Sequence, residues 1–143
     1  MADAGDVVGE FFAVYARATA SVDAGVLGSA YAEQFMFASP SGVQAVRRED
    51  FLKVVPKRKA FFTALGLKSS EIRRLEETVL DEQYLQVKVY WAFVFEKDPG
   101  RSIVDEGAAT YILRREGKGL QIVFQIDHQD LTKRAQELGL LPR

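Results

Sequence analysis

The side chains that could carry acid–base chemistry lie near the C-terminal end of the chain. His128 is the only histidine, and its imidazole could act as a general acid or base because imidazole titrates near neutral pH. Residues 120–128 alternate as a strand does, so Asp127 and His128 point to opposite faces and are not predicted to pair. Asp127 shares its face with Gln125, which makes it the stronger candidate for proton transfer. The alternatives are a solvated carboxylate at a strand end and, for His128, a structural or exposed role.

Two aromatic residues add a polar edge to otherwise apolar patterns. Tyr15 lies on the apolar side of a helix expected over residues 6–21, and its hydroxyl would need a partner if buried. Trp91 belongs to a long strand expected over residues 84–96. One face of this strand is wholly apolar, and it consists of Leu85, Val87, Val89, Trp91, Phe93 and Phe95. Both aromatic residues fit either a core or the wall of a ligand pocket.

Composition excludes several kinds of site. The chain has 143 residues, 48% of them hydrophobic and none of them cysteine, so we expect one domain, residues 1–143, with neither disulfides nor thiolate chemistry. A single histidine and no clustered carboxylates predict no metal site. The chain has no P-loop, GxGxxG or nucleophile elbow, so no cofactor is expected.

Charge and hydropathy favour a soluble cytoplasmic protein that binds neither nucleic acid nor membrane. The net charge is −1, so no overall field attracts a polyanion. No segment approaches the roughly 20 apolar residues of a membrane span, and the N-terminus lacks a secretory signal pattern. Residues 47–74 hold nine basic and three acidic residues. This segment is either the solvated face of a helix with its exit loop or a patch that binds anions or nucleic acid.

The order of the expected elements is typical of an α+β fold. After the first helix, Asp23 is placed to cap a short second one, and a short strand at 35–39 ends at Pro40. A helical region follows from Arg48, with a break expected at Pro56. Strands are then expected at about 71–79, 84–96, 103–113 and 120–128, and a final helix at 131–138. Consecutive strands predict an antiparallel sheet with one face covered by helices.

Several local motifs lie along nearly the whole chain, from about residue 6 to 131. They are Val22-Asp23-Ala24-Gly25 after the first helix, then Tyr31-Ala32-Glu33 leading into Phe35–Ser39 and Pro40, and the closing strand pair from Thr110 to Asp130. Together these motifs resemble the nuclear transport factor 2-like superfamily. The sequence is most similar to the SnoaL-like and ketosteroid isomerase-like branch. That resemblance implies a cystatin-like cone, in which a strongly bent antiparallel sheet wraps round N-terminal helices and encloses a pocket.

The resemblance also suggests roles for individual residues. Isomerases of this branch carry a tyrosine in the first helix, which Tyr15 matches. Their carboxylate base before a proline is replaced here by Ser39, and their second acid by Thr110 or Ala109. Because a serine hydroxyl is far too weak a base, we do not expect ketosteroid-type isomerisation. The resemblance also implies that the face of the last strand that carries Asp127 lies toward the pocket.

Two functional hypotheses follow, and whether the protein is an enzyme stays open. In the first, the cone binds a small, mostly apolar molecule, with Asp127 and Tyr15 catalysing isomerase, cyclase or dehydratase-type proton transfer. The ligand contacts would then be Ser39, Trp91, Thr110, Gln125 and His128. In the second, the chain is a non-catalytic dimerisation or interaction module whose pocket is filled by its own side chains. In either case we expect a homodimer through the outer face of the sheet, formed by Tyr90, Ala92, Val94, Ile122, Phe124 and Ile126.

Overall fold

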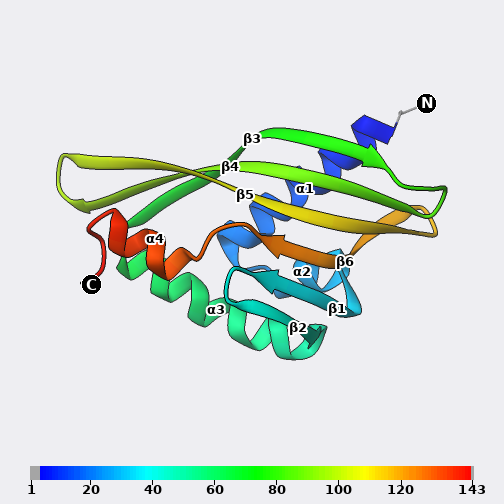
Figure 1. Cartoon of the computed structure of the whole chain (residues 1–143), viewed down its shortest axis with the longest axis horizontal. Helices are drawn as coiled ribbons and strands as arrows, with labels where there is room; N and C mark the ends of the chain where they lie inside the picture. The colour runs from blue at the N-terminus through cyan, green and yellow to red at the C-terminus, as the bar shows by residue number, and fades with distance from the viewer. Residues whose placement is uncertain (1–3, 143) are drawn as a thin grey trace.

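Four helices and six strands follow one another nearly as expected in the computed structural model, which describes residues 4–142 (Figure 1). They are α1 (Ala4–Ser21), α2 (Ala24–Ala30), β1 (Tyr31–Ser39), β2 (Gly42–Arg47), α3 (Arg48–Ala64), β3 (Leu67–Val79), β4 (Tyr84–Asp98), β5 (Arg101–Glu116), β6 (Gly119–Asp127) and α4 (Leu131–Glu137). Strand β2 was not anticipated. Within residues 4–142, no helix is long and apolar enough to cross a membrane.

The six strands form one sheet in the order β2-β1-β6-β5-β4-β3. Strands β3 to β6 form an antiparallel meander, and β1 and β2 form a hairpin. The hairpin joins the meander through β1 and β6, which run parallel, so the sheet is mixed rather than wholly antiparallel as predicted. Residue alternation shows that a segment is a strand but carries no information on which strand it pairs with.

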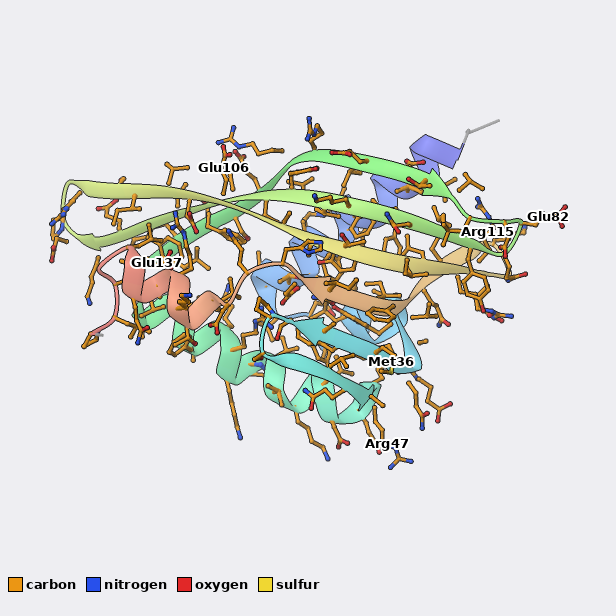
Figure 2. All side chains as sticks on the ribbon, in the orientation of Figure 1. Met36, Arg47, Glu82, Glu106, Arg115 and Glu137 are labelled. Atoms are coloured by element: carbon orange, nitrogen blue, oxygen red, sulfur yellow. The ribbon has the colours of Figure 1, made fainter. Side chains whose placement is uncertain are left out.

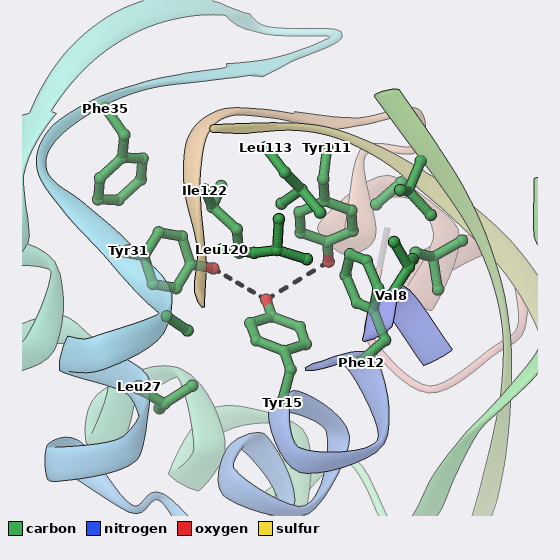
Figure 3. Close-up of a cluster of buried hydrophobic side chains, with 14 of the residues drawn as sticks. Val8, Phe12, Tyr15, Leu27, Tyr31, Phe35, Tyr111, Leu113, Leu120 and Ile122 are labelled. Atoms are coloured by element: carbon green, nitrogen blue, oxygen red, sulfur yellow. Dashed lines mark hydrogen bonds between the residues drawn. The ribbon is translucent and has the colours of Figure 1, made fainter. Parts of the chain in front are cut away.

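The main core lies between the inner face of the sheet and helices α1 and α2 (Figure 3). The apolar face predicted for β4 is confirmed, because Leu85, Val87 and Val89 are fully buried there. From α1, Phe12 packs against this face and against Tyr111 of β5, with ring centroids 5.1 Å apart. Asp23 caps α2 as predicted by accepting a hydrogen bond from the Val26 amide at 3.1 Å.

A smaller apolar cluster joins α4 to the far end of the β4–β5 hairpin and to the end of α3. Beside it, Asp105 of β5 is buried and accepts two hydrogen bonds from the Arg134 guanidinium, at 2.7 and 3.0 Å. Its neighbour Glu106 is exposed and points away from the sheet (Figure 2).

Helix α3 continues through Pro56, where a break was expected. A proline inside a helix removes one hydrogen bond and crowds the carbonyl four residues earlier, at a cost of about 3 kcal/mol. Packing on both sides offsets that cost. Phe51 contacts the main core before the proline, and Phe62 contacts the smaller cluster after it.

A β-bulge at Val123 changes which side chains of β6 face inward. The pairing moves from Ile112–Phe124 to Leu113–Ile122, so β6 contributes one extra residue. Ile122 is therefore fully buried in the main core, although strict alternation had placed it on the outer face with Phe124 and Ile126. Gln125 and Asp127, beyond the bulge, face inward as the resemblance implied.

Candidate functional site

A cavity of about 220 Å³ lies between the sheet and helices α1 and α3. Its lining comes from α1 to α3, from the start of β3 and from the middle of β4 and β5, and β6 closes it with Gln125 and Asp127. Four residues that the sequence singled out therefore meet at one cavity, namely Tyr15, Trp91, Gln125 and Asp127. They come from three different elements, so only the folded chain assembles them.

Three buried tyrosines meet at the base of the cavity, and we call Tyr15, Tyr31 and Tyr111 the tyrosine cluster (Figure 3). The Tyr15 and Tyr31 hydroxyl oxygens are 2.8 Å apart, and Tyr111 donates to Tyr15 over 3.4 Å. Tyr31 in turn donates to Gln125 Oε1 at 2.6 Å. Because the Tyr31 proton is directed to Gln125, Tyr15 must donate to Tyr31. The three hydroxyls and Gln125 thus form a chain of hydrogen bonds in which every hydroxyl proton points toward β6.

Asp127 holds the far end of this chain in place. Gln125 Nε2 donates to Asp127 Oδ1 at 3.0 Å, and Arg58 of α3 lies 3.4 Å from Asp127 Oδ2. A carboxylate only accepts hydrogen bonds, so the Gln125 amide must turn its nitrogen toward Asp127 and its oxygen toward Tyr31. The charge on Asp127 thus sets the direction of every hydrogen bond in the chain.

Burial raises the pKa of all three hydroxyls in the tyrosine cluster. The shift is largest for Tyr31 and Tyr111, where burial is the main cause and the neighbouring Tyr15 and Asp127 add to it. For Tyr15, burial again outweighs its hydrogen bonds with Tyr111 and Tyr31, which lower its pKa. These tyrosines therefore stay neutral at physiological pH and can act as hydrogen-bond donors but not as bases.

The rest of the cavity wall is mostly aromatic. The rings of Trp91 and Phe93 stack at 6.3 Å with an interplanar angle of 15°, and Phe51 and Phe62 of α3 lie in the same lining. Asp127, whose side chain is 15% exposed, is the only acid among the lining residues described. The arrangement suits an apolar molecule that meets one carboxylate and a set of neutral hydroxyls.

The other three residues considered from the sequence lie outside this cavity. Ser39, at the end of β1, bonds Ser41 at 2.8 Å and lines a separate outer depression beyond Asp127. Thr110 and His128 bond each other at 2.6 Å. They lie on the outer side of the sheet because strand residues alternate, and the neighbouring Ala109 and Asp127 occupy the inner side.

Sequence reasoning missed Tyr31, Tyr111 and Arg58. Tyr111 follows the inward parity of Ala109 and Leu113, so the alternation of β5 could have identified it. Tyr31 directly follows the short second helix and begins β1. Arg58 was one of nine basic residues in a run, and only the position of α3 brings it to Asp127.

No protein-family model matches this chain, and its sequence matches no curated protein. Solved structures do match it. An NTF2-like protein with a cystatin-like fold from Novosphingobium aromaticivorans is 17% identical with a TM-score of 0.71, over 96% of this chain and 88% of that one. Aln2 from a Streptomyces species is 16% identical with a TM-score of 0.72, over 90% and 93%.

The β subunit of the benzoate 1,2-dioxygenase from Burkholderia mallei is also similar, at 15% identity and a TM-score of 0.69, over 93% of this chain and 94% of that one. Identities this low establish the fold alone. The fold was predicted from the N-terminal motifs and the closing strand pair, and the solved structures bear it out. This chain therefore has the same cystatin-like fold as the NTF2-like protein from Novosphingobium aromaticivorans.

Proposed function

We propose that the cavity binds a small, mostly apolar molecule and that Asp127 removes a proton from it. The observation that carries this proposal is the hydrogen-bonded chain running from the tyrosine cluster through Gln125 to Asp127, inside an aromatic cavity. An open cavity at Tyr15 and Asp127 also weighs against the alternative of a module filled by its own side chains.

The chemistry would be proton transfer beside a carbonyl group. Asp127 would accept a proton from the carbon next to the carbonyl, and the electron pair of the broken C–H bond would move onto the carbonyl oxygen. A neutral tyrosine hydroxyl would then stabilise that oxygen. Tyr111 is best suited to donate, because its bond to Tyr15 is the longest of the chain at 3.4 Å. Returning the proton from Asp127 to a different carbon of the ligand would give isomerisation. Loss of a hydroxide from the β-carbon, which leaves as water with the proton held by Asp127, would give dehydration.

Binding can be measured without knowing the natural ligand, because Trp91 is the only tryptophan and lies in the cavity wall. We expect 2-indanone, a small enolisable ketone, to change Trp91 fluorescence saturably. Ala109→Leu should fill the cavity and abolish the response. Ala45→Leu, on the exposed face of β2, is the matched control and should preserve it. An unchanged titration in Ala109→Leu would show that the ketone binds elsewhere.

Proton abstraction is tested by following deuterium exchange into 2-indanone by NMR. Asp127→Asn keeps the shape of the side chain but removes the base, so we expect it to bind the ketone and lose catalysed exchange. Asp130→Asn is the matched control. Asp130 caps α4 through the Lys133 amide, and asparagine caps helices equally well. Exchange that persists in Asp127→Asn would exclude Asp127 as the base.

We further propose that two copies pair through the outer face of the sheet. Tyr90 and Val94 of β4, with Phe124 and Ile126 of β6, are half-buried there in the single chain. Ile122 no longer belongs to this set because the bulge turns it inward. Sedimentation analysis should show a dimer that Phe124→Glu converts to a monomer, and a monomeric parent protein would refute the pairing.

A further inference from the structure

Three basic residues belong to the same cavity lining as Asp127. Of the nine basic residues in segment 47–74, three belong to the cavity lining, namely Arg58 and Lys59 of α3 and Lys68 of β3. Asp127 is the only acid in the same lining. Three cations against one anion, at a cavity with low-dielectric walls, favour a ligand that carries negative charge.

Two of these three cations already have partners. Arg58 pairs with Asp127 at 3.4 Å, and the Lys59 ammonium donates to the carbonyl of Ala20 in the last turn of α1. Lys68 forms no ion pair within the part of the chain that the structure describes. One cation at the cavity therefore remains uncommitted.

Lys68 lies at a β-bulge in the cavity lining. Leu67 pairs with Phe95 and Ser69 with Val94, so Lys68 is the extra residue on β3. Residues 67–70 all belong to the lining, and Lys68 is exposed to solvent. Bulges commonly re-aim a side chain beside a binding site.

The volume of the cavity limits the apolar part of the ligand. A cavity of about 150 Å³ lined by apolar side chains holds one benzene ring, and this one has about 220 Å³. It therefore accommodates one ring with a short substituent. The stacked pair Trp91–Phe93 offers that ring an aromatic surface.

We propose that the ligand is a small aromatic monocarboxylic acid, with its ring against Trp91 and its carboxylate paired with Lys68. This inference rests on the proposed function and defines the ligand class for the same cavity. A single negative charge matches the single uncommitted cation. A doubly charged group would need a second cation, and Arg58 could supply it only by leaving Asp127.

Phenylacetate and phenylacetamide test the inference because they share a shape and differ in charge. We expect phenylacetate to bind about tenfold more tightly by Trp91 fluorescence, as one well-placed charge pair allows, and this preference to shrink with added salt. Lys68→Gln should lower the affinity for phenylacetate several-fold and leave that for phenylacetamide unchanged. Lys57→Gln is the matched control, because Lys57 is exposed on α3 and outside the lining.

Every other outcome overturns the inference. Equal affinity for acid and amide, or an acid preference that survives Lys68→Gln, would reject the carboxylate site while leaving the proposed binding function intact. Tighter binding of phenyl phosphate than of phenylacetate would show that the site takes a doubly charged group instead. No response to the acid, the amide or 2-indanone would reject both the inference and the proposed function.

Discussion

Replacing Tyr31 by phenylalanine tests whether the hydrogen bonds around the cavity act as a connected chain. Tyr31 is fully buried. Its hydroxyl accepts from Tyr15 at 2.8 Å and donates to Gln125 at 2.6 Å. Tyr31→Phe removes one oxygen and leaves two buried groups without their partner, the Tyr15 hydroxyl proton and Gln125 Oε1.

A buried polar group left without a partner costs about 1–3 kcal/mol. Two such groups, partly relieved by water entering from the adjoining cavity, should lower the free energy of unfolding by about 2–3 kcal/mol. Tyr111→Phe is the matched control, because Tyr111 is equally buried and loses the same atom. Its hydroxyl only donates over 3.4 Å, and Tyr15 keeps its bond to Tyr31, so the loss should stay below about 1 kcal/mol.

Urea unfolding followed by far-ultraviolet circular dichroism measures both variants with a signal that does not depend on Trp91. The expected result is a clearly lower midpoint for Tyr31→Phe than for Tyr111→Phe, with similar slopes. Equal midpoints would refute the reasoning. They would mean that the two hydroxyls contribute equally to the free energy of unfolding, regardless of their position in the chain of hydrogen bonds.

Three further predictions concern other parts of the molecule. Because burial raises the pKa of the tyrosine cluster, the folded state keeps these protons while the unfolded chain releases them near pH 10. Stability should therefore be full below pH 10 and fall above it by up to about 1.4 kcal/mol per pH unit for each tyrosine, which urea midpoints between pH 8 and 12 would show. Val22 has a φ of 56°, a strained conformation for a β-branched residue. Val22→Gly should therefore raise the melting temperature. The free energy of unfolding should increase by about 1 kcal/mol, which is the relieved strain less the entropy cost of ordering a glycine. Arg134→Leu leaves Asp105, whose side chain is 7% exposed, without its partner. This variant should lower the free energy of unfolding by about 2–3 kcal/mol, more than Asp105→Ala does. Amide hydrogen exchange in α4 should become faster in the same variant.

Strands β4 and β6 show how far alternation predicts side-chain direction. β4 pairs with β5 without a shift from Tyr84 to Glu96, so the apolar face seen in the sequence is the buried face. β6 looks equally regular in sequence, yet the bulge at Val123 exchanges its faces midway. A bulge depends on how the partner strand is placed, and alternation along one strand does not contain that information.

The site was predictable to the extent that it depends on a single element. Trp91 could be singled out from the clear alternation of β4, whereas the inward direction of Gln125 and Asp127 came from the family resemblance. The contacts that join them could not, because Tyr31 lies 94 residues from Gln125 and Arg58 lies 69 residues from Asp127. Such pairs are set by strand order and by the path of α3, which passes through Pro56 against its local propensity.

Three costly features lie together in this part of the fold. The cavity leaves about 220 Å³ without packed side chains, so the residues that line it lose contacts that a filled core would have. The tyrosine cluster buries hydroxyls where aliphatic side chains would pack at no polar cost. The Arg58–Asp127 pair holds a largely buried carboxylate beside them. Departures from good packing that coincide in this way are typical of sites that bind a ligand or carry out chemistry. The cavity, rather than the regular outer face of the sheet, is therefore the region to test first.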